Sequence, residues 1–161
     1  MDPKIHVLSR ALIIHNDQLL LAYDPRQEPK HYYELNAPFF YLPGGHLEFK
    51  ESSEDALLRE IFEETGYGSD IERFLGVLEH SWKFPGDEVC YHTHEINLIF
   101  KVNLKGIKSN IKIVQKEEHV AFKWVSLEKI NDIDLRPAIL KNMIPQWLVD
   151  NKLRMFQSVM T

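Results

Sequence analysis

Three glutamates lie close together in the middle of the chain, and carboxylates grouped in this way can bind a divalent metal ion. Glu60, Glu63 and Glu64 are spaced i, i+3 and i+4, so on an α-helix they share one arc of the surface. Like charges at this spacing destabilise a helix by roughly 0.2–0.5 kcal/mol per pair. Carboxylate oxygens are the ligands that Mg²⁺ prefers. The alternative is a solvated acidic face in which Arg59 pairs with Glu63, and the trio alone does not decide between them.

The segment that carries these glutamates is predicted to be a helix over residues 53–65. Ser52 or Ser53 is a suitable N-cap, the acidic residues that follow favour the first turn, and Gly66 provides the stop. On a helical wheel one arc of apolar residues is predicted to face the core: Leu57, Leu58, Ile61 and Phe62. The glutamates lie on a different arc, so the helix can pack and present carboxylates at the same time.

The rest of the chain predicts strands, loops and two short helices without a regular βαβ repeat. Alternating apolar residues indicate strands within 4–23 (two strands around a turn at Asn16-Asp17), 39–42, 71–82, 89–102 and 119–125. A turn is expected at 85–87 and polar loops at 24–38 and 103–117. Helices are expected at 127–131 and 136–150, within a C-terminal helical extension over about 136–157. This mixture predicts an α/β (α+β) fold, a mixed β-sheet flanked by helices.

Length and composition fit one domain over residues 1–161. The chain is 44% hydrophobic and 27% charged, which excludes collagen-like, low-complexity and wholly disordered classes. Its one cysteine, Cys90, excludes an internal disulfide framework and suits a reducing compartment. No early apolar run approaches the ~20 residues of a spanning helix, so we expect a cytoplasmic protein with no membrane partner.

The net charge limits the class of partner. With 19 Lys and Arg against 24 Asp and Glu, the formal charge is -5. A chain this acidic is a poor candidate for binding nucleic acid through its net field. If it handles phosphates, local cations or a bound metal ion must supply the positive charge.

The residues around the predicted helix resemble the Nudix box, the signature of the Nudix hydrolase family (MutT-like). That pattern is Gly, five residues, Glu, seven residues, Arg-Glu, a bulky apolar residue, any residue, Glu-Glu, any residue, Gly and a bulky apolar residue. Gly45, Glu51 and the run 59–67 match every fixed glycine and polar position. Tyr67 departs from the usual aliphatic residue, but it lies beyond the carboxylates. The resemblance covers roughly residues 4–130, with the box at 45–67.

This resemblance implies an α/β/α sandwich that hydrolyses a nucleoside diphosphate linked to another moiety, with Mg²⁺ or Mn²⁺ as cofactor. Carried over by position, the implied metal ligands are the Gly44 carbonyl, Glu60, Glu63 and Glu64. Arg59 would orient the glutamates, and Glu51 would join that network or bind a second ion. The general base differs among members, and Glu60 is our first choice. The implied partner is a small nucleoside diphosphate derivative.

One further carboxylate is expected from outside the box. Nudix sites often recruit an acidic residue from the loop before the Trp-containing strand, as a metal ligand or as the base. Here the candidates are Glu117 and Glu118, and we choose Glu118 because of its place directly before the strand that holds Trp124. The alternative is that both are solvated loop residues.

Two rival functions keep the same fold: a non-hydrolytic nucleotide-binding or regulatory module, and an isoprenyl-diphosphate isomerase. No box glutamate is lost, and the regular box favours hydrolysis. The residues leave the particular nucleotide substrate and the oligomeric state open, a homodimer included.

Weaker signals lie near the box. Cys90, His92 and His94 alternate along a predicted strand, but three such residues without a fourth favour a structural role over a zinc site. On the other face Glu95 and Asn97 point to substrate or to solvent. Four aromatic residues before the box could stack a base, but we favour a place in the core for them: Tyr32, Tyr33, Phe39 and Phe40. Three residues on the long loop could contact phosphates or only solvent: Arg26, Lys30 and His31.

Overall fold

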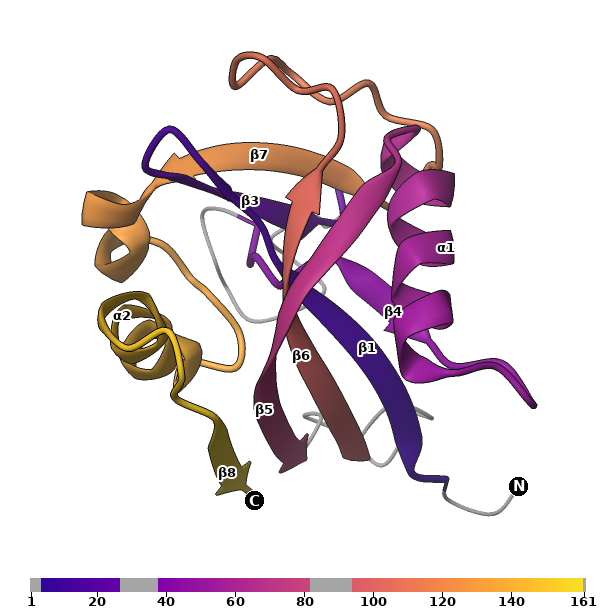
Figure 1. Cartoon of the computed structure of the whole chain (residues 1–161), viewed down its shortest axis with the longest axis vertical. Coiled ribbons are helices and arrows are strands. Elements are labelled where there is room, and N and C mark those ends of the chain that lie inside the picture. Colours follow the sequence, from indigo (N-terminus) through magenta and orange to yellow (C-terminus); the bar gives the residue numbers. More distant parts are fainter. Residues whose placement is uncertain (1–3, 27–37, 82–93, 161) are drawn as a thin grey trace.

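A mixed five-stranded β-sheet forms the middle layer of the fold in a computed structural model, which describes residues 4–26, 38–81 and 94–160 (Figure 1). The strand order is β4 (Gly44–His46), β1 (His6–Leu12), β6 (His94–Leu104), β5 (Ser69–Ser81) and β8 (Met155–Val159). The pairs β1–β6 and β5–β8 are parallel, whereas β1–β4 and β5–β6 are antiparallel. A three-stranded antiparallel sheet comprises β2 (Ile14–His15), β3 (Gln18–Tyr23) and β7 (Ala121–Ser126).

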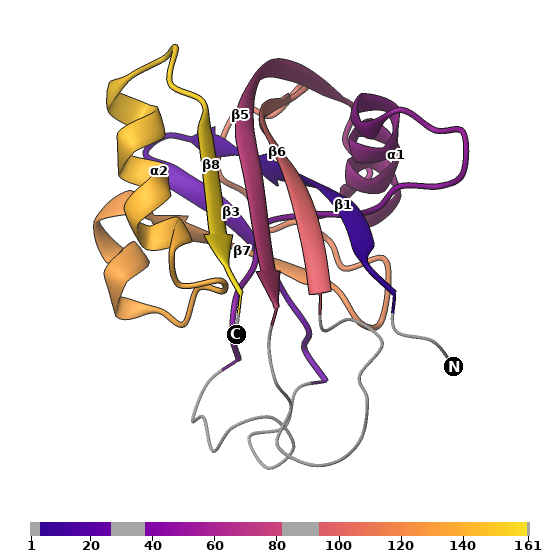
Figure 2. The same cartoon turned by 90° about the horizontal axis from the view of Figure 1, so that it is seen from below.

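The helices lie on opposite sides of the strands. Helix α1 (Ser53–Thr65) is on one side, and the 3₁₀ helix η1 (Leu127–Asp132) and helix α2 (Leu140–Val149) are on the other, as the two views show (Figures 1 and 2). This arrangement confirms the mixed sheet flanked by helices that the sequence predicts and the α/β/α sandwich that the resemblance implies. No helix in the described ranges is long and apolar enough to cross a membrane.

Two separate apolar clusters hold these layers together. The α1 cluster packs Leu57 and Ile61 against Ala11 and Val102, and the α2 cluster packs Trp147 and Met143 of α2 against strand residues that include Leu12. Ala11 and Leu12 are neighbours on β1, so the pleat of the strand sends successive side chains into different clusters. The sheet is therefore buried on both faces, and α1 is anchored independently of α2.

The predicted helix over 53–65 is confirmed with its bounds. The Ser52 hydroxyl accepts a hydrogen bond from the Asp55 backbone N–H, and Gly66 ends the helix in the left-handed conformation at φ 77°. The assignment of Phe62 to the buried face is wrong, because its side chain is 59% exposed. The buried stripe runs instead through Leu57, Ile61 and Glu64, which are spaced i, i+4 and i+7.

Two other sequence predictions need correction. The segment 39–42 forms only isolated bridges. The strand begins after Pro43 instead, as β4, and pairs with β1. The helical extension over 136–157 is wrong at its end, because α2 stops at Val149 and residues 155–159 form β8. Exposed and partly buried residues alternate along β8, which is the period of a strand, and Met155 and Val159 on the partly buried face pack against the α2 cluster.

The segment 4–23 forms three strands and not the two predicted, because β1 pairs in the five-stranded sheet whereas β2 and β3 form a hairpin in the other sheet. Asn16 and Asp17 form the turn of this hairpin, as predicted, both with positive φ. The other elements follow the prediction to within a few residues. Strands β5, β6 and β7 correspond to the predicted strands over 71–82, 89–102 and 119–125, and η1 to the short helix at 127–131. The turn at 85–87 and most of the loop 24–38 lie outside the described residues.

The N-cap of α1 gives a matched pair of variants. Ser52→Ala removes the hydroxyl that accepts the Asp55 N–H, and loss of such a cap costs about 1 kcal/mol of unfolding free energy. Ser53→Ala makes the same chemical change one residue later, where the hydroxyl caps nothing, and is expected to stay within about 0.5 kcal/mol of wild type. Urea denaturation of both variants measures the difference, and equal stabilities would contradict the assigned cap.

Candidate active site

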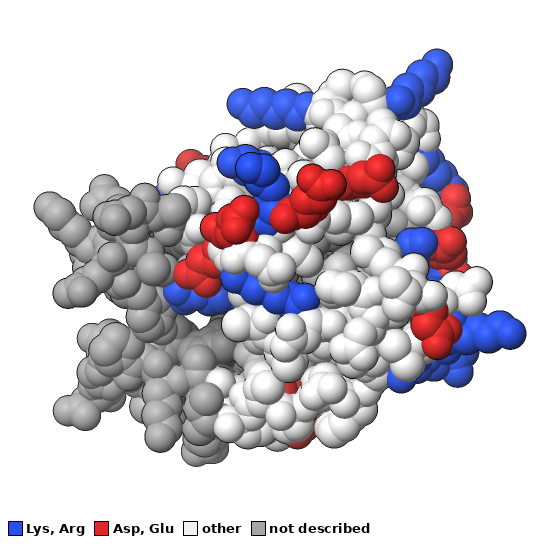
Figure 3. Space-filling view, turned by 90° about the vertical axis from the view of Figure 1, so that its left-hand side faces the viewer, with Lys and Arg blue, Asp and Glu red and all other residues white. Residues whose placement is uncertain are grey.

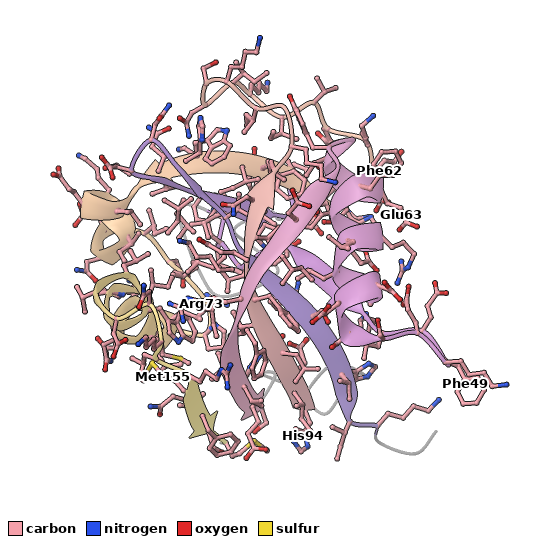
Figure 4. The ribbon with its side chains drawn as sticks, viewed as in Figure 1. Phe49, Phe62, Glu63, Arg73, His94 and Met155 are labelled. Atoms are coloured by element: carbon pink, nitrogen blue, oxygen red, sulfur yellow. The ribbon has the colours of Figure 1, made fainter. Side chains whose placement is uncertain are left out.

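Helix α1 presents the three glutamates of the box in three different environments. Glu63 is exposed and points away from the sheet (Figure 4), Glu60 is half-buried, and Glu64 is only 7% exposed. These differences follow from the helical period, because Glu64 continues the stripe of Leu57 and Ile61 whereas Glu63 lies about 100° away. One helix therefore carries a solvated, an intermediate and a desolvated carboxylate.

Arg59 binds the surrounding carboxylates together. Its Nε and Nη2 donate to the two oxygens of Glu51 at 2.8 and 3.0 Å, a bidentate pair. Its Nη1 donates to Glu60 Oε1 at 3.1 Å and to Glu63 Oε2 at 3.2 Å. The hydrogen bond from Arg59, followed by that from the Glu48 backbone, lowers the pKa of Glu51. Hydrogen bonds and charges of Glu51, and then of Glu60, raise the pKa of Arg59, so this cation stays charged.

Glu64 has the most perturbed carboxyl of the three. Burial, and then the charge of Glu60, raise the pKa of Glu64 to about 8, while Arg10 opposes the shift. Its Oε2 atom is buried and has no hydrogen-bond partner among the described residues. A desolvated carboxylate oxygen with no partner is costly, so this atom marks a place where a cation would stabilise the site.

The backbone of β4 approaches the helix at the same point. A Cβ on Gly45 would lie 2.5 Å from Glu60 Oε1, so a larger residue here would displace the Glu60 carboxyl from its present position. Gly44 has φ 135°, and its carbonyl oxygen accepts a hydrogen bond from Arg10 Nη1 at 3.2 Å. The glycines of the box thus place the backbone of β4 close to the carboxylates of α1.

The donors fit a hard divalent cation such as Mg²⁺ or Mn²⁺. Carboxylate and carbonyl oxygens are present, and the unpartnered Glu64 oxygen lacks the positive charge that an ion would provide. In the described part of the chain, no three His, Cys, Asp or Glu side chains are placed so that they could hold an ion as they stand. Glu60 and Glu63 each accept a hydrogen bond from Arg59, which offsets part of their negative charge.

The two glutamates outside the box, Glu117 and Glu118, lie in different environments. The charge of Glu117 contributes to the raised pKa of both Glu60 and Glu64. Glu117 is partly buried and pairs with His119 at 3.3 Å, whereas Glu118 is exposed. The bridge from Glu117 to Val120 turns the backbone here, and this turn could not be read from two adjacent glutamates.

Several candidates from the sequence lie elsewhere. Phe40 is buried in the α2 cluster, as favoured, and Phe39 lies under the Arg136 guanidinium, 4.3 Å from its carbon to the ring centroid. Arg26 pairs with Asp24 at 2.9 Å. Those outside the described residues are Lys30, His31, Tyr32, Tyr33, Cys90 and His92, so the zinc alternative is not tested; His94 begins β6.

A row of hydrogen-bonded polar side chains, His80, Glu95, Asn97 and Arg10, lies on the sheet and is called the buried polar chain below; its pairing was not predicted from the sequence. Glu95 and Asn97 face neither solvent nor the α1 cluster; Glu95 Oε2 lies 3.2 Å from His80 Nε2 and accepts from Asn97 Nδ2 at 3.3 Å. Asn97 Oδ1 in turn accepts from Arg10 Nε at 3.2 Å. One sequence feature pointed to this row, because Arg10 is a charged residue among the apolar residues of β1. Its contact with Asn97 depends on the pairing of β1 with β6, which the sequence does not reveal.

Charged side chains on the face that Figure 3 displays are of both signs. Among the described residues visible there, Lys and Arg do not gather into one patch but are interspersed with Asp and Glu. The field of this face is therefore mixed, in keeping with the formal charge of -5.

The buried Glu64 carboxyl predicts how stability depends on pH in the metal-free protein. Its pKa is raised on folding, so the native state binds more protons than the unfolded state between about pH 4.5 and 8, and stability falls as pH rises through this range. Glu64→Gln is therefore expected to raise the Tm at pH 8.5 and to leave it nearly unchanged at pH 4. Glu63→Gln, at an exposed carboxyl, is the control, and an equal Tm rise in both variants would contradict burial as the cause.

Comparison with known proteins identifies the family. The NUDIX domain model matches residues 5–147. The ADP-ribose pyrophosphatase of Methanocaldococcus jannaschii is 36% identical over 74 residues, which are 44% of this chain and 40% of that protein. Alignments with three curated relatives cover 24–40% of the relatives' lengths.

Solved structures share the fold over nearly the whole chain. A NUDIX hydrolase from Nitrosomonas europaea has a TM-score of 0.67 and 22% identity over 94% of both chains. The MutT protein from Bacillus halodurans has a TM-score of 0.67 and 17% identity, covering 96% of this chain and 89% of that one. Because the family model spans most of the chain, including the whole box, this protein belongs to the NUDIX domain family.

Proposed function

We propose that this protein is a pyrophosphohydrolase, which uses Mg²⁺ or Mn²⁺ to hydrolyse a nucleoside diphosphate linked to another moiety. The observation that carries the proposal is the buried, unpartnered Oε2 of Glu64, a carboxyl on which the charge of Glu60 acts. A structural carboxylate at this position would be expected to have a hydrogen-bond donor. Membership of the family and the intact box support the same reading.

The reaction is attack of water on one phosphorus of the diphosphate. The water oxygen forms a new P–O bond, the bridging P–O bond breaks, and the proton lost by the water must be accepted by a base. Glu60 is our first choice of base, because its carboxyl is half-buried and burial raises its pKa above the ordinary value. Glu60 Oε1 is held by Arg59, which fixes the orientation of the carboxyl.

The residues that would hold the ion are the Gly44 carbonyl, Glu60, Glu63 and Glu64. The chemistry that a bound Mg²⁺ or Mn²⁺ supplies is neutralisation of phosphate oxygens and a lower pKa for bound water. Arg59 keeps Glu51, Glu60 and Glu63 within hydrogen-bond reach of one guanidinium and so limits their mutual repulsion. For the acidic residue outside the box, we replace Glu118 with Glu117 as the preferred candidate, in the role of ligand or base.

The particular substrate is a matter for a screen. The printed name of one relative, ADP-ribose pyrophosphatase, makes ADP-ribose a first compound to try, together with nucleotide sugars, dinucleoside polyphosphates, NADH and nucleoside triphosphates. Hydrolysis is preferred over a non-hydrolytic module and over isoprenyl-diphosphate isomerisation because every glutamate of the box is retained.

A first test combines the screen with removal of the ion. With Mg²⁺, the wild type should release phosphate-containing products from at least one compound, and exhaustive chelation should abolish turnover. Glu60→Gln should lower kcat by about 10²-fold or more, the contribution of a positioned base. Glu54→Gln is the control, because it removes an exposed carboxyl from the same helix.

Three outcomes would count against the proposal. Full turnover after chelation would contradict the proposed metal site. No turnover on any compound would favour the non-hydrolytic module. Equal losses in Glu60→Gln and Glu54→Gln would show that the assay follows the general charge of the helix and not the site.

A second test separates the two late glutamates. Glu117→Gln should lower turnover or Mn²⁺ affinity by about tenfold, because the Glu117 charge acts on Glu60 and Glu64. Glu118→Gln removes the same charge one residue away, at an exposed side chain, and should be nearly silent. Steady-state kinetics and Mn²⁺ titration measure both variants, and the reverse pattern would restore the original assignment of Glu118.

A further inference from the structure

Arg10 lies between the candidate metal site and the buried polar chain on the sheet. Its Nη1 donates to the carbonyl oxygens of Leu42 and Gly44, both at 3.2 Å. Its Nε donates to Asn97 Oδ1 at 3.2 Å, and its guanidinium carbon lies 5.5 Å from the centroid of the Tyr41 ring. Backbone, amide and aromatic ring together fix the guanidinium in one position.

The second terminal nitrogen of Arg10 is not used by the fold. In the described ranges, Arg10 Nη2 donates no hydrogen bond and Arg10 forms no ion pair with a carboxylate. The side chain is partly accessible to solvent. A guanidinium has five N–H donors in a rigid fork, so this one keeps donors available while its remaining donors hold it still.

The polar chain behind Arg10 explains why the cation does not fold back onto an acid. Glu95, the nearest buried carboxylate along β6, is engaged by His80 and Asn97 through the same oxygen, Oε2. Asn97 therefore stands between the Arg10 and Glu95 charges, bonding to both. Arg10 acts on Glu64 and Glu95 through its field, yet it is not paired with either.

We propose that Arg10 binds a phosphate oxygen of the substrate through Nη2, and this inference rests on the proposed diphosphate hydrolysis. Arg10 already bonds to the carbonyl of Gly44, the backbone oxygen assigned to the metal, so an anion bound at that site lies beside the guanidinium. The forked donors match a phosphate group. Three carboxylates of the box already accept hydrogen bonds from Arg59, and the fourth, Glu64, has an oxygen without a partner. A diphosphate therefore needs a further cation that is not already paired.

The competing explanation is that Arg10 only fixes the Leu42–Gly44 backbone. In that case the loss of Arg10 would disturb the Gly44 carbonyl, and the affinity for the metal ion would fall together with the affinity for the anion. If Arg10 contacts the substrate directly, the affinity for the ion alone is kept and only the affinity for the anion falls. Binding measurements without turnover distinguish the two.

The experiment measures Mn²⁺ affinity alone and then imidodiphosphate affinity at saturating Mn²⁺, by titration calorimetry on the full chain. Arg10→Gln is expected to weaken imidodiphosphate binding by roughly 10–100-fold, the range for hydrogen bonds to charged groups, with Mn²⁺ affinity within about twofold of wild type. Lys141→Gln removes a positive charge from α2, where Lys141 Nζ donates to the Asn131 carbonyl; this variant is the control and should match wild type.

Arg10→Lys is the second variant, in case the glutamine variant does not fold. It keeps the charge and loses the planar fork, so imidodiphosphate affinity should fall several-fold with Mn²⁺ affinity unchanged. Imidodiphosphate affinities equal to that of the control would overturn the inference, and so would a parallel loss of Mn²⁺ affinity. If the wild type binds imidodiphosphate, loses it on Arg10→Gln and yet hydrolyses no compound, the proposed function fails and this inference stands.

Discussion

The fork of Arg59 is the interaction on which the candidate site depends. Three carboxylates, those of Glu51, Glu60 and Glu63, accept hydrogen bonds from this one guanidinium. Without it, like charges on adjacent turns of α1 and on the loop before it would repel each other. The arginine therefore allows a short helix to carry an acidic cluster that is useful to a phosphate-handling enzyme and unfavourable to the helix itself.

Glu64 shows how the site and the core compete for the same stripe of α1. Leu57 and Ile61 are completely buried, and the next position on that stripe is a carboxyl instead of an apolar side chain. An apolar residue there would pack against the α1 cluster at no electrostatic cost. The free energy lost by burying a carboxyl is the kind of local penalty that functional sites accept and the remaining core offsets.

The sequence predicted the helix, its cap and the grouping of the box because these depend on residues close together in the chain. It failed where the outcome depends on distant pairing. Residues 155–159 form a strand because β5 offers a free edge, and Phe62 is exposed because the buried stripe of α1 is set by β1 and β6. Arg10 and Asn97 are 87 positions apart, and only the β1–β6 register brings them into contact.

The division of the interior into an α1 cluster and an α2 cluster has a consequence for engineering. Substitutions in separate, non-touching groups of side chains combine almost additively in their effect on stability. Trp147 and Met143 lie across the sheet from the glutamates of α1, so repacking α2 offers thermostability without touching the residues that pack α1. A library of variants confined to α2 could raise the free energy of unfolding. Destabilising substitutions around Glu64 and Arg10 would then be tolerated during directed evolution.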